Sequence, residues 1–68
     1  MREELIQLLR QTPFQAFEVN LSSGETLRIE HAEQAMLTNT GLYVAQGEAT
    51  ERVAIRHITH LTVLEPAA

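Results

Sequence analysis

The chain has 68 residues, which suits one small domain spanning 1–68, since chains divide into separate domains only at several hundred residues. Its charged residues are Glu and Arg, with no Asp and no Lys, and its formal net charge is −4. This acidity disfavours both a nucleic-acid backbone and an anionic membrane surface as the main partner. Cysteine is absent, which excludes disulfides, and so small a core favours self-association as the stabiliser.

The chain shows no sign of a membrane or secretory segment. No apolar run approaches the roughly 18 residues of a membrane span. The first four residues lack the basic start and apolar centre of a signal peptide. We therefore expect a cytoplasmic protein with no membrane partner.

The first element predicted is a helix over about 2–11. Apolar residues recur there at helical spacing and occupy one arc of the helix, with Glu and Gln on the other arc. Glu3 and Glu4 lie where a helix N-terminus favours negative charge. Pro13 restricts the residue before it to extended conformations, so the helix should end at about Gln11.

Five or six short strands are predicted over about 14–65. The apolar positions Phe17, Val19 and Leu21 alternate with polar ones, which indicates a strand with one buried face. Turn signals around residues 22–25, 39–41 and 46–50 separate further short strands. Residues 31–34 are expected to form a loop or a single helical turn, and residues 65–68 a frayed tail.

This order of elements predicts a mainly β fold, in which the helix caps a strongly bent, antiparallel small barrel. In so short a chain, a bent barrel is the main way to hide the edges of several strands. Phe14 and Phe17 are expected to hold the helix against the barrel as core residues.

Two stretches carry a resemblance to known small barrels. Residues 17–24, an alternating strand leading to Gly24, resemble the first motif of Sm-like proteins, and residues 55–58 resemble the second motif. The Asp and Asn that hold a base in Sm proteins have no counterpart between Glu30 and Thr38. The order of parts is also similar to that of SH3-like domains. The Sm-like resemblance implies an RNA-binding ring of several copies.

A second resemblance is to a set of short bacterial proteins of uncharacterised activity. These begin with a helix, followed by Pro-Phe-x-x-Phe and a strand ending in Leu-Ser/Ala-x-Gly. The corresponding stretches here are residues 13–17 and 21–24. This resemblance implies the same small-barrel fold and no particular chemistry.

His57 and His60 are the candidates for a metal site. Histidines three residues apart meet on one side of a helical turn, but on a strand they point to opposite faces. We favour partly exposed histidines with no metal, and no cofactor is expected.

Catalysis is not expected either. The chain has no Cys, Lys or Asp, and its two serines, Ser22 and Ser23, lie together in a predicted turn. So short a chain also leaves little room for a pocket of the roughly 300 Å³ that small ligands need. We therefore expect a protein that is not an enzyme.

Five residues are candidates for contact with nucleic acid or a protein partner. Arg residues on the polar faces of two strands could form a basic stripe beside the single Tyr. These candidates are Arg28, Arg52, Arg56, His57 and Tyr43. In the favoured alternative, the Arg side chains pair with Glu18, Glu30 and Glu51 across the strands.

The leading hypothesis is a non-enzymatic module for protein interaction or oligomerisation, acting as a homo-oligomer or with a protein partner. The small core, the many strand edges and the missing catalytic residues support it. The alternative is an Sm-like, RNA-binding ring protein.

Overall fold

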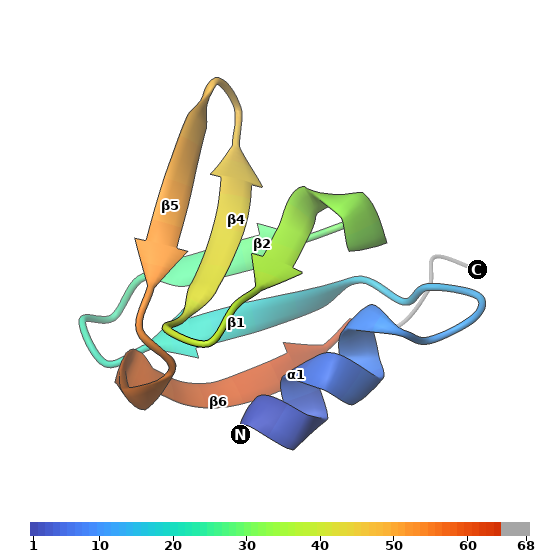
Figure 1. The fold of residues 1–68 in the computed structure, drawn as a ribbon, viewed down its shortest axis with the longest axis horizontal. Coiled ribbons are helices and arrows are strands. Elements are labelled where there is room, and N and C mark those ends of the chain that lie inside the picture. The colour runs from blue at the N-terminus through green and yellow to red at the C-terminus, as the bar shows by residue number, and fades with distance from the viewer. Residues whose placement is uncertain (65–68) are drawn as a thin grey trace.

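The computed structural model describes residues 1–64 as one short helix followed by six strands (Figure 1). The strands are connected by tight turns and by two short 3₁₀ helices, η1 and η2. In chain order the elements are α1 Arg2–Leu9, β1 Phe17–Leu21, β2 Thr26–Ile29, η1 Ala32–Gln34, β3 Ala35–Leu37, β4 Leu42–Gln46, β5 Ala49–Val53, η2 Ile55–His57 and β6 Ile58–Val63.

The strands form two antiparallel sheets of three, ordered β2-β1-β6 and β3-β4-β5. The predicted mainly β class with an N-terminal helix is confirmed. The predicted barrel is wrong in one respect, since no strand of one sheet pairs with a strand of the other and the barrel is not closed. The chain leaves the first sheet after β2, forms η1 and only then enters β3, so no continuous strand joins the sheets.

The boundaries also differ from the prediction. The helix ends at Leu9 rather than Gln11, and the first strand begins at Phe17 rather than at residue 14. The ambiguous segment 31–34 contains a single 3₁₀ turn. The predicted end of the strands at 65 and the predicted tail over 65–68 lie outside the described residues.

The core lies between the inner faces of the two sheets and α1. In β1, Val19 lies opposite Leu27 on one side and Leu61 on the other, so alternate residues of three strands share one face. Phe17 is fully buried, and the half-buried Phe14 packs against it with ring centroids 6.0 Å apart. The expected core role is confirmed for Phe17, whereas Phe14 lies at the border of the core. The buried set is Leu5, Phe17, Val19, Leu27, Ile29, Leu42, Val44, Val53 and Ile58.

Two glycines make the hairpin turns. Gly24 has φ of 96° and Gly47 has φ of 62°, a region that residues with a Cβ atom rarely adopt. Gly24 occupies the left-handed position of a three-residue loop, and Gly47 the first position of a two-residue loop. These turns set the register of β1 with β2 and of β4 with β5.

The side chain of Gln34 bridges the two sheets. Its Nε2 donates to the carbonyl oxygen of Arg28 in β2 at 2.9 Å and to that of Ala45 in β4 at 3.0 Å. Its Oε1 accepts from the backbone N–H of Glu30 at 2.9 Å. One amide therefore replaces the backbone pairing that a closed barrel would have supplied at this junction.

Candidate interaction surfaces

The outer face of the sheet β2-β1-β6 is polar and its central side chains bond to one another. Asn20 lies in the middle strand, where its Nδ2 donates to Thr62 Oγ1 at 3.0 Å and its Oδ1 accepts from Thr26 Oγ1 at 3.2 Å. These bonds cross all three strands. This face has the composition that a solvent-facing sheet surface requires.

The outer face of the sheet β3-β4-β5 is different, because apolar side chains occupy it. Tyr43 in β4 lies opposite Met36 in β3 and Arg52 in β5. Met36 is 66% exposed, the largest exposed fraction among the large hydrophobic residues within 1–64. Ala45 follows Tyr43 on the same face, so β4 is apolar on both faces along most of its length.

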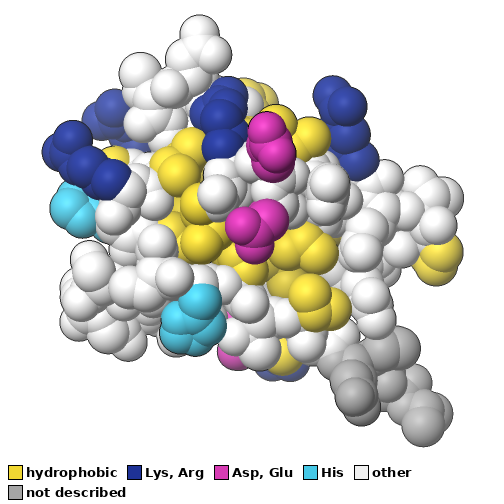
Figure 2. Space-filling view, turned by 90° about the horizontal axis from the view of Figure 1, so that it is seen from below, with side chains coloured by type: hydrophobic (Ala, Val, Ile, Leu, Met, Phe, Trp, Pro, Cys, Tyr) yellow, Lys and Arg dark blue, Asp and Glu magenta, His cyan; other side chains and the backbone are white. Residues whose placement is uncertain are grey.

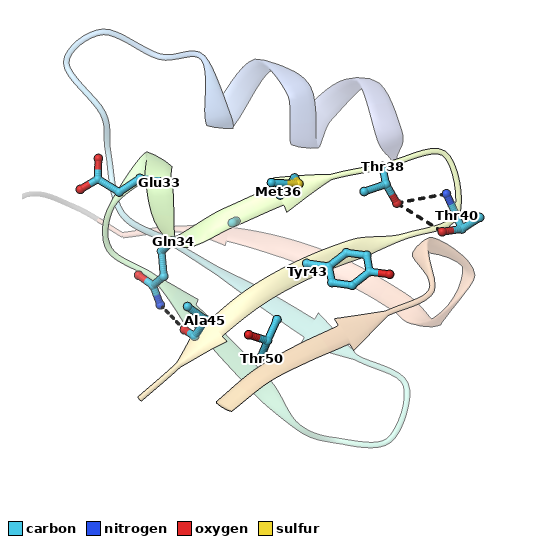
Figure 3. Close-up of a pocket in the computed structure, with 9 residues that line it drawn as sticks. Glu33, Gln34, Met36, Thr38, Thr40, Tyr43, Ala45 and Thr50 are labelled. Carbon is cyan, nitrogen blue, oxygen red and sulfur yellow. Dashed lines mark hydrogen bonds between the residues drawn. The ribbon is translucent and has the colours of Figure 1, made fainter. Parts of the chain in front are cut away.

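A shallow cavity of about 460 Å³ runs over this face, and we call it the outer groove. Met36, Tyr43 and Ala45 belong to its apolar lining (Figure 3). Thr38 and Thr40 lie at one end in this view, and Glu33 and Gln34 lie toward the other. The remaining lining residues are Ala35 and Thr50.

Much of the polar lining of the outer groove is already bonded within the protein. The Thr38 hydroxyl accepts from the backbone N–H groups of Thr40 and Gly41, both at 3.2 Å. The Gln34 amide makes the three bonds that bridge the sheets. Glu33 is the one charged residue lining the groove, and it forms no ion pair within residues 1–64.

The structure brings three of the five predicted contact residues to one end of the molecule. Arg52 and His57 line a second cleft, of about 320 Å³, between the β1–β2 turn and η2. Arg56 lies beside His57 in η2 and is exposed. Glu25 and Glu51 line the same cleft, so acidic and basic groups are mixed there.

The other two predicted contact residues lie elsewhere. Arg28 is on the polar outer face of β2, opposite Glu18 in register, and its Nε lies 3.8 Å from Glu30 Oε1. Both partners of this ion pair are more than half exposed, so it contributes little to stability. Tyr43 lies in the outer groove. The five residues therefore do not form one continuous basic patch.

Among residues 1–64, the one Arg–Glu ion pair joins Arg28 to Glu30 along the same segment, and the expected pairing across strands is not found. Neither Arg52 nor Arg56 forms an ion pair with any of these residues. Arg52 lies opposite Tyr43 rather than opposite a carboxylate.

The two candidate metal ligands, His57 and His60, are both exposed. His57 ends η2 and His60 lies in β6, where its Nδ1 is 3.2 Å from the hydroxyl of Thr59. Across residues 1–64, no group of three or more His, Cys, Asp or Glu side chains is arranged to hold a metal ion.

β6 has one free edge. The N–H of Leu64 donates to the carbonyl oxygen of Ala16 at 2.9 Å, which sets the alternation of the β1–β6 ladder. By that alternation, the backbone groups of Leu61 and Val63 point away from β1. No other strand within residues 1–64 pairs with this edge. The Val63 side chain is 46% exposed.

In Figure 2, the molecule is seen from the side on which α1 and β6 lie, and hydrophobic side chains gather at the centre of that face.

β5 also has one free edge. The residues flanking the two-residue loop, Gln46 and Ala49, form the first hydrogen-bonded pair of the β4–β5 hairpin. Alternation then directs the backbone groups of Thr50 and Arg52 outward, away from β4. In Figure 1 this hairpin projects beyond the rest of the molecule, and four of the five residues of β5 are exposed.

Sequence reasoning missed the outer groove and the Gln34 bridge. The groove had a visible signal, because residues 42–45 form an apolar run where a half-exposed strand should alternate. The Gln34 bridge had none. Its partners are only 4, 6 and 11 residues away, but they lie in or beside strands of two different sheets, and a local pattern does not show how the sheets pack.

A scan against protein-family models, a search of curated proteins and a search of solved structures each returned no match. Within residues 1–64, no helix is both long enough and apolar enough to cross a membrane.

Proposed function

We propose that this protein is a non-enzymatic interaction module that assembles with further copies of itself through the free edges of β5 and β6. The observation that carries the proposal is the pair of unpaired edges. A strand edge presents unpaired N–H and C=O groups that a strand from another chain can satisfy. The absence of Cys, Lys and Asp from the chain supports a role without catalysis. We also propose that the protein is cytoplasmic, as expected from the sequence.

The other two sheet edges are less available to a second copy. The edge of β2 is partly occupied by Gln34, whose Nε2 donates to the Arg28 carbonyl oxygen. β3 contacts α1, and Arg2 Nη1 of this helix donates to the carbonyl oxygen of Thr38 just beyond β3, at 2.7 Å. Within residues 1–64, the outward backbone groups of β5 and β6 have no such side-chain partner.

The two free edges are complementary to each other. β5 offers Thr50 and Arg52, and β6 offers Leu61 and Val63, each pair spaced two residues apart. Antiparallel pairing of β5 with β6 of a second copy would satisfy both sets of backbone groups and cover the exposed Val63 side chain. Because the two surfaces differ, the assembly keeps one free β5 edge at one end and one free β6 edge at the other until it closes into a ring. The ring implied by the Sm-like resemblance fits this mode of assembly.

Proline variants test the proposal by removing one outward N–H group. Thr50→Pro blocks the β5 edge without removing a bond to β4, and Val63→Pro does the same for β6 with respect to β1. Native mass spectrometry and light scattering should show an oligomer for the wild type and a monomer for each variant. Thr50→Ala and Val63→Thr keep the N–H group and should remain oligomeric.

Mixing the two proline variants gives the decisive result. Thr50→Pro retains a working β6 edge and Val63→Pro a working β5 edge, so an equimolar mixture should form a heterodimer and nothing larger. Circular dichroism should show that each variant is folded. A wild-type protein that stays monomeric at millimolar concentration, or folded proline variants that still form the full oligomer, would overturn the proposal.

RNA binding by the assembly is a second candidate function, favoured by the gathering of Arg52, Arg56 and His57 around η2. Arg56→Glu should abolish the retention of a fluorescein-labelled oligouridine at low salt, whereas Arg28→Glu, on the far polar face, should leave it unchanged. Failure of the wild type to bind this RNA at low salt would reject the candidate.

A further inference from the structure

The outer groove is not explained by self-association through strand edges. It lies on the face of β3-β4-β5, whereas the proposed contact between copies uses the sides of β5 and β6. Met36 and Tyr43 expose apolar surface there, beside each other in register. A contiguous apolar patch on a small protein, bordered by hydroxyl groups, marks a binding surface.

The chemistry of the groove is that of an apolar floor with one free negative charge. The Thr38 hydroxyl and the Gln34 amide are engaged within the protein. Glu33 remains as the charged lining residue and has no ion-pair partner within residues 1–64. Arg52 lies opposite Tyr43 on the same face of the sheet, but it lines the second cleft and is not among the lining residues of the groove, so Glu33 is the one charge within that lining.

We propose that the outer groove binds an extended peptide segment of a partner protein, in which a large apolar residue lies two residues from a Lys or Arg, so that both side chains face the groove. The apolar side chain would cover Met36 and Tyr43, and the basic side chain would reach Glu33. The formal net charge of −4 also favours a basic partner. Charge complementarity therefore selects a basic over an acidic segment.

The shape of the groove favours a peptide over a small molecule. Its lining residues spread over β3, β4 and β5 (Figure 3), and the cavity is more open than enclosed. A site for a small ligand normally encloses most of the ligand surface. A peptide can instead use several side chains along an open surface and needs no enclosure. This binding needs only one folded copy, so it does not depend on the proposed assembly.

The chain provides two probes that report on the groove. Tyr43 is the only tyrosine and the chain has no tryptophan, so intrinsic fluorescence comes from the groove floor. Of the two methionines, Met36 lines the groove and Met1 precedes α1. A spectrum of protein labelled with ¹³C at the methionine methyl groups therefore contains one groove signal and one control signal.

The ligand probes are three pools of acetylated pentapeptides without Tyr or Trp. Each pool has Leu or Phe fixed at the centre and, two residues after it, Arg in the first pool, Glu in the second and Ser in the third. The Arg pool should shift the Met36 methyl signal and change Tyr43 fluorescence more than the other pools, with the Met1 signal unmoved. Equal responses to the Arg and Glu pools, or no response of Met36 to any pool, would overturn the proposal.

Two variants distinguish the contribution of the Glu33 charge to peptide binding from that of the apolar floor. Glu33→Gln should weaken binding of the Arg pool by about two- to fivefold and reduce its salt dependence, whereas Glu48→Gln at the exposed β4–β5 turn should not. Met36→Ser should weaken the Arg and Ser pools alike, by about fivefold or more. These measurements use the monomeric Val63→Pro protein beside the wild type. If the wild type itself stays monomeric but the Arg pool still shifts the Met36 signal, only the proposed function is rejected. If the wild type assembles as proposed and no pool shifts that signal, only the groove proposal is rejected.

Discussion

The two sheets of this protein differ in the face that they turn to solvent. On β2-β1-β6, Asn20 connects Thr26 and Thr62 through hydrogen bonds across three strands. On β3-β4-β5, the corresponding central position is Tyr43, with the exposed Met36 beside it. The first face satisfies its own polar groups, whereas the second leaves apolar surface uncovered. The second face is therefore the one that we propose as a binding surface.

The largest effect on the free energy of unfolding is expected from the inner face of β4, the strand whose outer face lines the outer groove. Leu42 is fully buried, so Leu42→Ala should lower the free energy of unfolding by about 2–5 kcal/mol, as cavities in small cores do. Met36→Ala, on the exposed face, should change it by less than about 0.5 kcal/mol. Urea unfolding followed by circular dichroism measures both. Equal losses would mean that Met36 is a core residue and would remove the distinction between the two faces.

The second effect concerns the bridge between the sheets. Gln34→Leu leaves the N–H of Glu30 and two carbonyl oxygens without their side-chain partner, which should cost about 1–3 kcal/mol. Amide hydrogen exchange at Glu30 should accelerate, whereas exchange at Val19, in the middle of β1, should change only by the global loss. Unchanged exchange at Glu30 would show that the bridge does not hold the sheets together.

A smaller effect is expected from the polar face itself. Asn20→Ala removes the bonds to Thr26 and Thr62 and should cost about 1 kcal/mol, because these groups are partly exposed and can turn to water. Thr50→Ala, on the other face, breaks no side-chain bond found within residues 1–64 and should be neutral in urea unfolding. A neutral Asn20→Ala would mean that the network is replaced by water at no cost.

The smallest effect is expected at the Arg28–Glu30 pair. Arg28→Gln should change the free energy of unfolding by no more than about 0.5 kcal/mol, because both side chains are more than half exposed. A larger loss in urea unfolding, removed by 1 M salt, would show that the polar face depends on charge rather than on the Asn20 bonds.

Much of the fold could be predicted because it depends on local patterns. The alternation at Phe17, Val19 and Leu21 marked the first strand, and Gly24 and Gly47 marked two of the turns at positive φ. The predicted helix exists but ends earlier. The prediction of a barrel was wrong in its closure. Closure depends on whether β2 continues into β3, and η1 intervenes between them.

The candidate site was predicted less well than the fold. Arg52 and His57 do line one cleft, but Arg28 lies on the polar outer face of β2 and Tyr43 in the outer groove.

The sequence determined the composition, the strands and their turns, because periodicity and glycine positions act over a few residues. The tertiary structure alone decided which edges remained free and which residues lined the groove. It did so because pairing between distant strands sets the neighbours of each side chain, and Gln34 finds its three partners only once both sheets have formed.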